Sequence, residues 1–390
     1  MNFLFIKTEK GITDLAYALQ RLGHHVQIAE SCTLDPLATA PQPSCAIIEQ
    51  LIEQQPIDYV ITYLYVPELS DLCNRLQIPY ISWNYDSPTV SLFHTSVYND
   101  CNRIFTFDQA QFDRLQALEV PHIYHLPLAA DGVRASGLSL SDSDRETYRS
   151  DISFVGTLYE NNLYNACRGM LPPEHLLPIN QYLMRELCHW DHTRSWLSLP
   201  DETVHLLTDV LGYHSDVCDI FELPQELYLG ILMLSRKLAE MERVTALSTL
   251  TEIAPVDLYT ASSGDRLSGI RLHPPVDYYT QLGKVYQCSR VNLNFTLPSI
   301  ETGIPQRVFD VLAYGGFLMT NAQPELSTCF IPGKDLVVFH DLSELKELTS
   351  YYLTHEEERR QIASHGRQTV LQNYTYEHLM TRMLALCETD

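Results

Sequence analysis

One stretch of the sequence, residues 301–321, combines residue types that bind anions at the start of a helix. It reads ETGIPQRVFDVLAYGGFLMTN, with Gly303 and Pro305 ahead of an expected helix and Arg307 one turn into it. Proline suits the first helical turn, and glycine lets the backbone come close to a ligand. Free amides at a helix start attract anions, and an arginine adds a bidentate partner for phosphate. The stretch therefore predicts a diphosphate site.

Asp310 follows Arg307 by three residues, so the two side chains share a face of the expected helix. A role in the predicted anion site is one interpretation of this pair. The same spacing is also that of an ordinary ion pair on a helix surface. Spacing alone leaves both interpretations open.

The elements that would position these residues alternate along the chain. In residues 1–135, short apolar runs separated by helical patterns predict parallel strands near 2–6, 26–30, 58–64, 79–85, 102–108 and 122–128. A Gly/Ser/Asp-rich run at 132–150 then predicts a connection. Its SDSD sequence, residues 141–144, imitates a D-x-D metal motif but lies in this connection and not after an apolar strand.

The same alternation returns in the second half, interrupted by a region without strand signals. Strands are expected near 151–156, 255–261, 269–273, 290–296, 317–321 and 335–340, and an all-helical insertion at about 163–250. We therefore expect an α/β protein with two Rossmann-like, doubly wound parallel-sheet domains, at 1–135 and 150–372. Residues 373–390 form a C-terminal helix that could cross back to the first domain.

Two such domains normally bind a ligand in the cleft between them, at the carboxyl ends of the strands. Neither opening strand is followed by G-x-G-x-x-G, and the chain has no G-x-x-x-x-G-K-[ST]. These absences argue against a dinucleotide-dependent dehydrogenase and a P-loop hydrolase.

Composition narrows the class of partner. The 390 residues carry 26 Lys and Arg against 49 Asp and Glu, a net charge of −23. An acidic surface repels nucleic acid and anionic membranes, so an anionic ligand needs a local cluster of hydrogen-bond donors. The ten cysteines form no C-x-x-C pair, and no apolar run has the length of a signal peptide or membrane span. We expect a cytoplasmic protein without nucleic-acid partners or an integral membrane segment.

The stretch RVFDVLAYGGFLMTN, together with residues 272–306 and 351–378, resembles the C-terminal domain of CgeB-type (spore maturation protein B-like) glycosyltransferases. PYISWNYDSPTVSLF, NRIFTFDQAQFDRL and IYHLPLAAD resemble their N-terminal domain. The resemblance implies a GT-B fold, a nucleotide-sugar donor held mainly by the C-terminal domain and an acceptor met by the N-terminal one. It also implies that no metal and no cofactor is required.

Related retaining enzymes frame this helix with an E-x7-E element, whose first acid touches the sugar and whose second binds the ribose hydroxyls. The resemblance places Asp310 at the second position. The first position falls on Thr302, with Glu301 one residue early. Glu301 is therefore the candidate for the acid that contacts the sugar.

The loop after the first strand of the C-terminal domain reads GTLYENN, where the broader family carries an arginine and a lysine against the diphosphate. Gly156, Thr157 and Asn161 are the candidates from this loop, and neither cation is present. Arg307 and Lys284 are then the expected nearby positive charges, since the leaving diphosphate accumulates negative charge. His273, at a strand end, could contact the nucleotide base or be an ordinary loop histidine.

On the acceptor side, a polar cluster is expected at the carboxyl end of a buried strand, facing the cleft. It consists of Trp83, Asn84, Tyr85 and Asp86. Asp86 is the candidate general base if the enzyme inverts configuration. The alternative is that Asp86 caps the turn that follows it.

Two further positions complete the acceptor-side candidates. His94 is a weaker candidate base, since it could equally be a structural histidine. Glu9, with Lys10 and Gly11, follows the first strand and is expected to line the same cleft.

The residues and the resemblance together predict a metal-independent transfer of a hexose-type sugar from a nucleoside diphosphate, expected to be UDP, to an unknown acceptor. Two alternatives remain open: a non-catalytic nucleotide-sugar-binding protein that lacks turnover, and a sugar-nucleotide 2-epimerase on the same fold.

Overall fold

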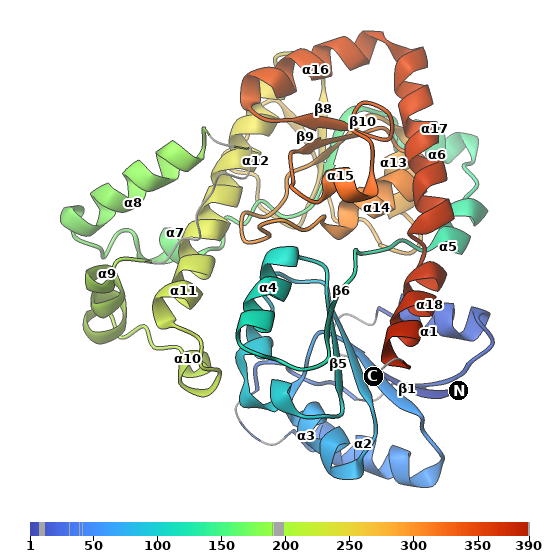
Figure 1. Ribbon diagram of the computed structural model, residues 1–390. Coiled ribbons are helices and arrows are strands. Elements are labelled where there is room, and N and C mark those ends of the chain that lie inside the picture. Colours follow the sequence, from blue (N-terminus) through green and yellow to red (C-terminus); the bar gives the residue numbers. More distant parts are fainter. Residues whose placement is uncertain are drawn as a thin grey trace. The chain divides into compact units, whose positions relative to one another are not determined.

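The computed structural model describes residues 1–7, 12–30, 32–38, 40, 42–188, 190 and 199–388. The chain forms two compact units, each with its own sheet (Figure 1). Unit 1 contains residues 1–128, 213–225 and 375–390, and unit 2 contains 129–212 and 226–374. Within the described residues, no helix is long and apolar enough to cross a membrane.

Unit 1 is built on a six-stranded parallel sheet in the order β2-β1-β3-β4-β5-β6. The central strands are apolar on both faces, which suits a sheet covered by helices on both sides. Leu4, Val60 and Ile104 are completely buried in its core. The strands are β1 (Asn2–Ile6), β2 (His25–Ala29), β3 (Tyr59–Tyr63), β4 (Tyr80–Asn84), β5 (Asn102–Thr106) and β6 (Ile123–His125).

The helices of unit 1 include one from the end of the chain. Helix α18 packs against α1, and Arg21 of α1 forms an ion pair with Glu377 of α18. The described helices are α1 (Asp14–Arg21), α2 (Pro43–Gln54), α3 (Pro67–Leu76), η1 (Val90–Phe93), η2 (Thr95–Tyr98), α4 (Gln109–Ala117), α10 (Asp216–Ile220) and α18 (Tyr376–Cys387).

Unit 2 has a second six-stranded parallel sheet, in the order β12-β11-β10-β7-β8-β9. Ile152, Leu258 and Leu293 lie in its buried core. The strands are β7 (Ser150–Val155), β8 (Val256–Tyr259), β9 (Ile270–His273), β10 (Ser289–Asn294), β11 (Leu318–Asn321) and β12 (Val337–Phe339). The predicted fold class, two doubly wound parallel sheets, is thereby confirmed.

Helices α14 and α17 pack against each other beside this sheet. The helices outside the insertion are α5 (Gly132–Gly137), α6 (Asp142–Thr147), α13 (Leu282–Cys288), α14 (Gln306–Ala313), α15 (Leu326–Cys329), α16 (Leu342–Thr354) and α17 (Glu356–Asn373).

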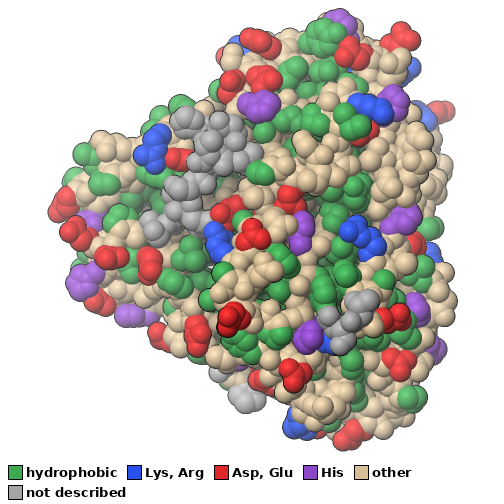
Figure 2. Space-filling model, viewed as in Figure 1, with side chains coloured by type: hydrophobic (Ala, Val, Ile, Leu, Met, Phe, Trp, Pro, Cys, Tyr) green, Lys and Arg blue, Asp and Glu red, His purple; other side chains and the backbone are tan. Residues whose placement is uncertain are grey.

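The described part of the region between β7 and β8 contains helices, joined by turns and irregular segments, and no strand. It contains α7 (Leu163–Cys167), α8 (Pro173–Glu186), α9 (Asp201–His205), η3 (Leu206–Val210), α10, α11 (Gln225–Gly230), η4 (Ile231–Ser235) and α12 (Arg236–Leu250). Its residues 213–225 belong to unit 1, where the ring of Phe221 packs edge-on against His94, with centroids 5.3 Å apart. Acidic side chains are scattered over the face of the molecule that Figure 2 shows, consistent with the net charge of −23.

Candidate functional site

The candidate site lies in unit 2, at the carboxyl ends of β7, β10 and β11. Buried side-chain amides tie these strand ends together. Asn294 donates to the hydroxyl of Thr320 (2.9 Å), and the amide N–H of Thr296 donates to Oδ1 of Asn321 (2.8 Å). Buried, fully bonded amides hold a backbone rigidly, so the rim of the site is preorganised.

Arg307 lies at the centre of this rim, as the second residue of α14. Its Nη1 donates to Oδ1 of Asn294 (2.7 Å), and its guanidinium lies 4.9 Å from the ring centre of Phe154. A Cβ at position 156 would lie 2.7 Å from Nη2 of Arg307, and Gly156 has a φ of 152°. Glycine therefore allows Arg307 to approach the end of β7, and the structure brings together these two predicted residues.

A second arginine, which the sequence did not indicate, lies beside the same loop. Arg243 of α12 donates from Nη1 to the carbonyl of Thr157 (2.6 Å) and from Nη2 to the carbonyl of Phe295 (2.9 Å). Its guanidinium lies 5.3 Å from the ring centre of Phe154, the ring that Arg307 also covers. Burial lowers the pKa of Arg243 to about 10, and the nearby charge of Arg307 adds to this effect. Arg243 remains protonated at neutral pH.

In the β7 loop, residues 156–162, three backbone amides donate to other groups of the protein. The N–H of Gly156 donates to the carbonyl of Tyr259 (3.0 Å), that of Leu158 to Oγ of Ser262 (2.9 Å) and that of Tyr159 to Oγ1 of Thr157 (3.1 Å). These amides are not available to an anion. Positive charge at this rim therefore comes mainly from arginine side chains.

Asp310 lies one turn after Gln306 on α14 and is only 4% exposed. Its Oδ1 accepts a hydrogen bond from Nε2 of Gln306 (3.0 Å). Burial raises the pKa of the neighbouring Tyr286 hydroxyl; Arg307 opposes this shift and Asp310 adds to it. Asp310 and Arg307 thus act on one buried phenol.

The side chains of Glu301 and Thr302, in the connection after β10, have different surroundings. Thr302 donates from its hydroxyl to Oε1 of Glu325 (2.7 Å) and accepts the N–H of Glu325 at its carbonyl (3.1 Å). Glu301 instead lines a small cavity at the ends of β10 and β11, with Trp190, Thr296, Leu297, Pro298, Ile300, Asn321 and Gln323. Gly303 is buried in the same connection. Glu301 lines the cavity, whereas Thr302, at the position of the first acid of the E-x7-E element, does not.

Lys284 has a different partner from the one that the sequence led us to expect. Its Nζ lies 2.8 Å from Oδ1 of Asp144, and this hydrogen bond lowers the pKa of Asp144 to about 2, with Ser141 contributing. Asp144 also completes the capping box of α6 with Ser141. Lys284 forms an ion pair with α6, and Asp144 of the SDSD sequence has a structural role.

His273 and Asn161 lie elsewhere at the same edge of the sheet. Nε2 of His273 is 2.7 Å from Oδ1 of Asp257, and its ring stacks on Tyr259 with centroids 4.5 Å apart. Asn161 is exposed in the turn before α7, while its neighbour Asn162 is buried and caps that helix.

In unit 1, β4 extends through Asn84, so two of the predicted acceptor-side residues lie inside the sheet. Trp83 is 1% exposed and Asn84 is fully buried. Asn84 donates to the carbonyl of Phe105 (3.0 Å) and accepts the N–H of Tyr65 (2.8 Å). The structure does not bring these two side chains to the surface.

The next two residues of this segment lie outside the strand. Tyr85 is half-buried and packs edge-on against Tyr63, with ring centroids 5.7 Å apart. Asp86 is exposed, and its backbone carbonyl accepts a hydrogen bond from the Thr89 hydroxyl (2.7 Å).

The imidazole of His94 contacts residues close to it in the sequence. Its Nδ1 accepts the N–H of Ser96 (3.1 Å) and so caps η2, and burial lowers the pKa of the imidazole. Glu9, Lys10 and Gly11 lie outside the described residues. Among the residues that are described, no group of three or more His, Cys, Asp or Glu side chains could hold a metal ion.

The chain is similar to known glycosyltransferases in part of its sequence and in its fold. Residues 241–385 match a family model described as glycosyl transferase-like, and no curated protein sequence matches the chain. Among solved structures, Anabaena Alr3699/HepE in complex with UDP and glucose has a TM-score of 0.55 at 10% identity, over 99% of each chain. The chain has the GT-B fold.

Other GT-B structures are similarly distant. Sucrose-phosphate synthase from Thermosynechococcus elongatus gives a TM-score of 0.53 at 11% identity, over 100% of this chain and 98% of that one. A glycosyltransferase from Rickettsia africae gives 0.53 at 11% identity, over 99% and 98%. The glycosyl transferase-like segment of this GT-B protein contains Arg243, Glu301, Arg307 and Asp310.

Proposed function

We propose that the protein is a glycosyltransferase of the CgeB type that transfers a hexose-type sugar from a nucleoside diphosphate to an acceptor. The observation that carries the proposal is the position of Arg307, next to Gly156 at the carboxyl ends of β7 and β10. This arrangement lies in a GT-B fold, and Arg307 itself falls in the segment that matches a glycosyl transferase-like family. UDP is the proposed nucleotide, because the similar Anabaena protein was solved with UDP and with UDP-glucose.

In this proposal the bond between the sugar C1 and the β-phosphate oxygen breaks, and a bond between C1 and an acceptor oxygen forms. UDP leaves with the bonding electrons, and Arg307 with the start of α14 stabilises its charge in place of a metal ion. In a retaining reaction the departing phosphate takes the acceptor proton. In an inverting reaction a base takes it, and Asp86 is the exposed candidate.

The acids have separate proposed roles. Glu301 lines the cavity beside the strand ends and is proposed to contact the sugar. Asp310 is proposed to accept from the ribose hydroxyls, which requires a small rearrangement of Gln306, its present partner. The reaction is proposed to take place in the cytoplasm.

A panel of nucleotide sugars tests the proposal. The protein is incubated with each sugar nucleotide, with and without candidate acceptors and with a chelator, and release of the nucleoside diphosphate is measured. We expect release from at least one UDP-sugar that persists with the chelator. Binding without release or hydrolysis would indicate a non-catalytic protein, and an isomerised sugar nucleotide would indicate an epimerase.

A further inference from the structure

Helix α12 ends the helical insertion and carries buried charged residues at a spacing of three. Lys237, Glu240 and Arg243 are 5%, 1% and 3% exposed. Residues three apart lie on the same side of a helix, so these three side chains run along one stripe of α12. Several of their partners, Thr157, Asn162 and Asn165, lie in the β7 loop or at the start of α7, so the stripe connects the insertion to the candidate site.

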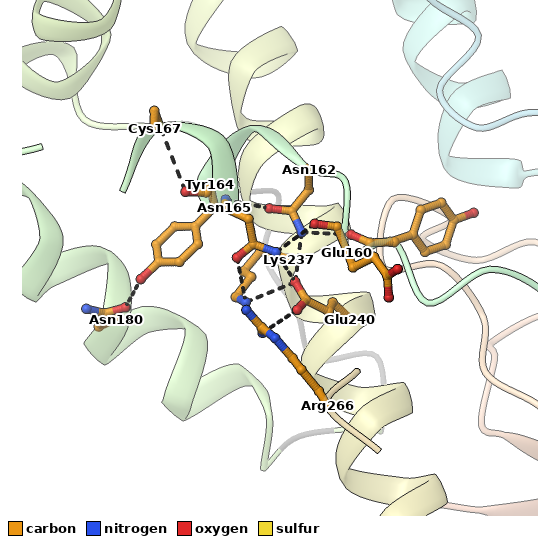
Figure 3. Close-up of polar contacts among 10 residues, drawn as sticks. Glu160, Asn162, Tyr164, Asn165, Cys167, Asn180, Lys237, Glu240 and Arg266 are labelled. Atoms are coloured by element: carbon orange, nitrogen blue, oxygen red, sulfur yellow. Dashed lines mark hydrogen bonds and ion pairs between the residues drawn. The ribbon is translucent and has the colours of Figure 1, made fainter. Parts of the chain in front are cut away.

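Glu240 is the anchor of this stripe (Figure 3). It accepts hydrogen bonds from the side-chain amides of Asn162 (2.8 Å) and Asn165 (2.6 Å), and it pairs with Lys237 (2.9 Å) and with Arg266. The two asparagines begin α7, directly after the β7 loop. The single carboxylate of Glu240 is therefore shared by two cations and two amides.

Arg243, one turn further along α12, has no such carboxylate. The described residues give it no ion pair, and Glu242, its neighbour in the chain, acts on it only through space. Nη1 and Nη2 donate to backbone carbonyls, and the buried Nε has no hydrogen-bond partner among the described residues. A desolvated cation without a counter-ion is unfavourable, and the positive charge of Arg307 nearby makes it more so. An anion bound at Arg307 would offset both charges.

We propose that Arg243 is a positioning residue for the diphosphate of the sugar nucleotide, supplied by the helical insertion in place of the cations that the β7 loop lacks. The inference rests on the proposed function, because it names a further residue of the same site. Arg243 fixes the carbonyl of Thr157, supports the Phe154 ring on which Arg307 lies, and adds unscreened positive charge behind the rim.

The test compares binding of UDP and of uridine, since only UDP carries the diphosphate. Affinities are measured by titration for the wild-type protein, Arg243→Gln, Arg243→Lys and Arg307→Ala. The control is Arg359→Gln, which removes another buried arginine of unit 2 that donates to a backbone carbonyl, that of Tyr352 (2.6 Å). Circular dichroism of each variant checks that it is folded.

We expect Arg243→Gln to weaken UDP binding at least tenfold and to leave uridine binding within twofold. Arg243→Lys should recover most of the UDP affinity. Arg359→Gln should leave the affinities for UDP and for uridine unchanged. Equal losses for UDP and uridine, or unchanged UDP binding in Arg243→Gln, would overturn the role of Arg243. If Arg307→Ala weakens UDP binding while Arg243→Gln does not, only this inference fails. A wild-type protein that binds none of UDP, ADP and GDP overturns the proposed function itself.

Discussion

Arg307 reaches the end of β7 because residue 156 has no side chain. Gly156→Ala would place a Cβ 2.7 Å from Nη2 of Arg307, at a φ of 152° that other residues avoid. We expect a loss of about 1–3 kcal/mol in the free energy of unfolding and a severalfold loss of UDP affinity. Denaturant titration and calorimetry measure the two effects. Gly169→Ala is the control, since its Cβ would meet nothing within 4 Å; equal effects of both substitutions would contradict the account.

Arg307 itself is expected to make the strongest single contact with the diphosphate. Arg307→Ala should weaken UDP binding by about 1.5–3 kcal/mol, the range for a hydrogen bond to a charged group. Calorimetric titration measures this loss. Arg360→Ala is the control, because Arg360 is exposed and its ion pair among the described residues is with Glu356 on its own helix. An unchanged UDP affinity in Arg307→Ala would remove this residue from the site.

At the scale of elements, α12 depends on Glu240 for its attachment to the β7 loop. Glu240→Ala would leave Lys237 buried without its carboxylate, and breaking a buried pair in this way costs about 3–5 kcal/mol. Chemical denaturation should show this loss. Glu252→Ala removes an exposed pair with Lys346 and should cost about 0–1 kcal/mol. A loss for Glu240→Ala no larger than that for Glu252→Ala would show that the buried contacts of Glu240 do not stabilise this attachment.

The imidazole of His94, which packs against Phe221, predicts a pH dependence of the stability of unit 1. Burial lowers the pKa of His94 below its usual value of 6.5, so the unfolded chain binds a proton more readily than the folded one. Stability should therefore fall as the pH decreases through 6.5 toward the lower folded pKa. Thermal unfolding between pH 7.5 and 5 should show a smaller decrease for His94→Gln than for the wild type. An identical slope would show that His94 does not contribute.

At the scale of the whole molecule, the sequence was sufficient for the architecture. Every predicted strand is present, because each is a short buried run between helical patterns, and parallel sheets require such runs. Gly156 and Arg307 were also predictable, since a loop after a strand and a helix start are local signals. These features depend on neighbours in the sequence.

The rest depended on packing between distant segments. Arg243 is 86 residues from Thr157 and comes from a helix whose sequence resembles any amphipathic helix. Lys284 is paired with Asp144, 140 residues away. The buried side chain of Asn84 bonds to Phe105 and Tyr65, which are 21 and 19 residues away.

The most direct test of the proposed diphosphate site is a crystal structure of the protein with UDP bound. We predict that the diphosphate lies at the carboxyl ends of β7 and β10, with a phosphate oxygen within hydrogen-bond distance of Arg307 and of the amides that begin α14. UDP bound at another place, without a hydrogen bond to Arg307, would contradict the proposed diphosphate site.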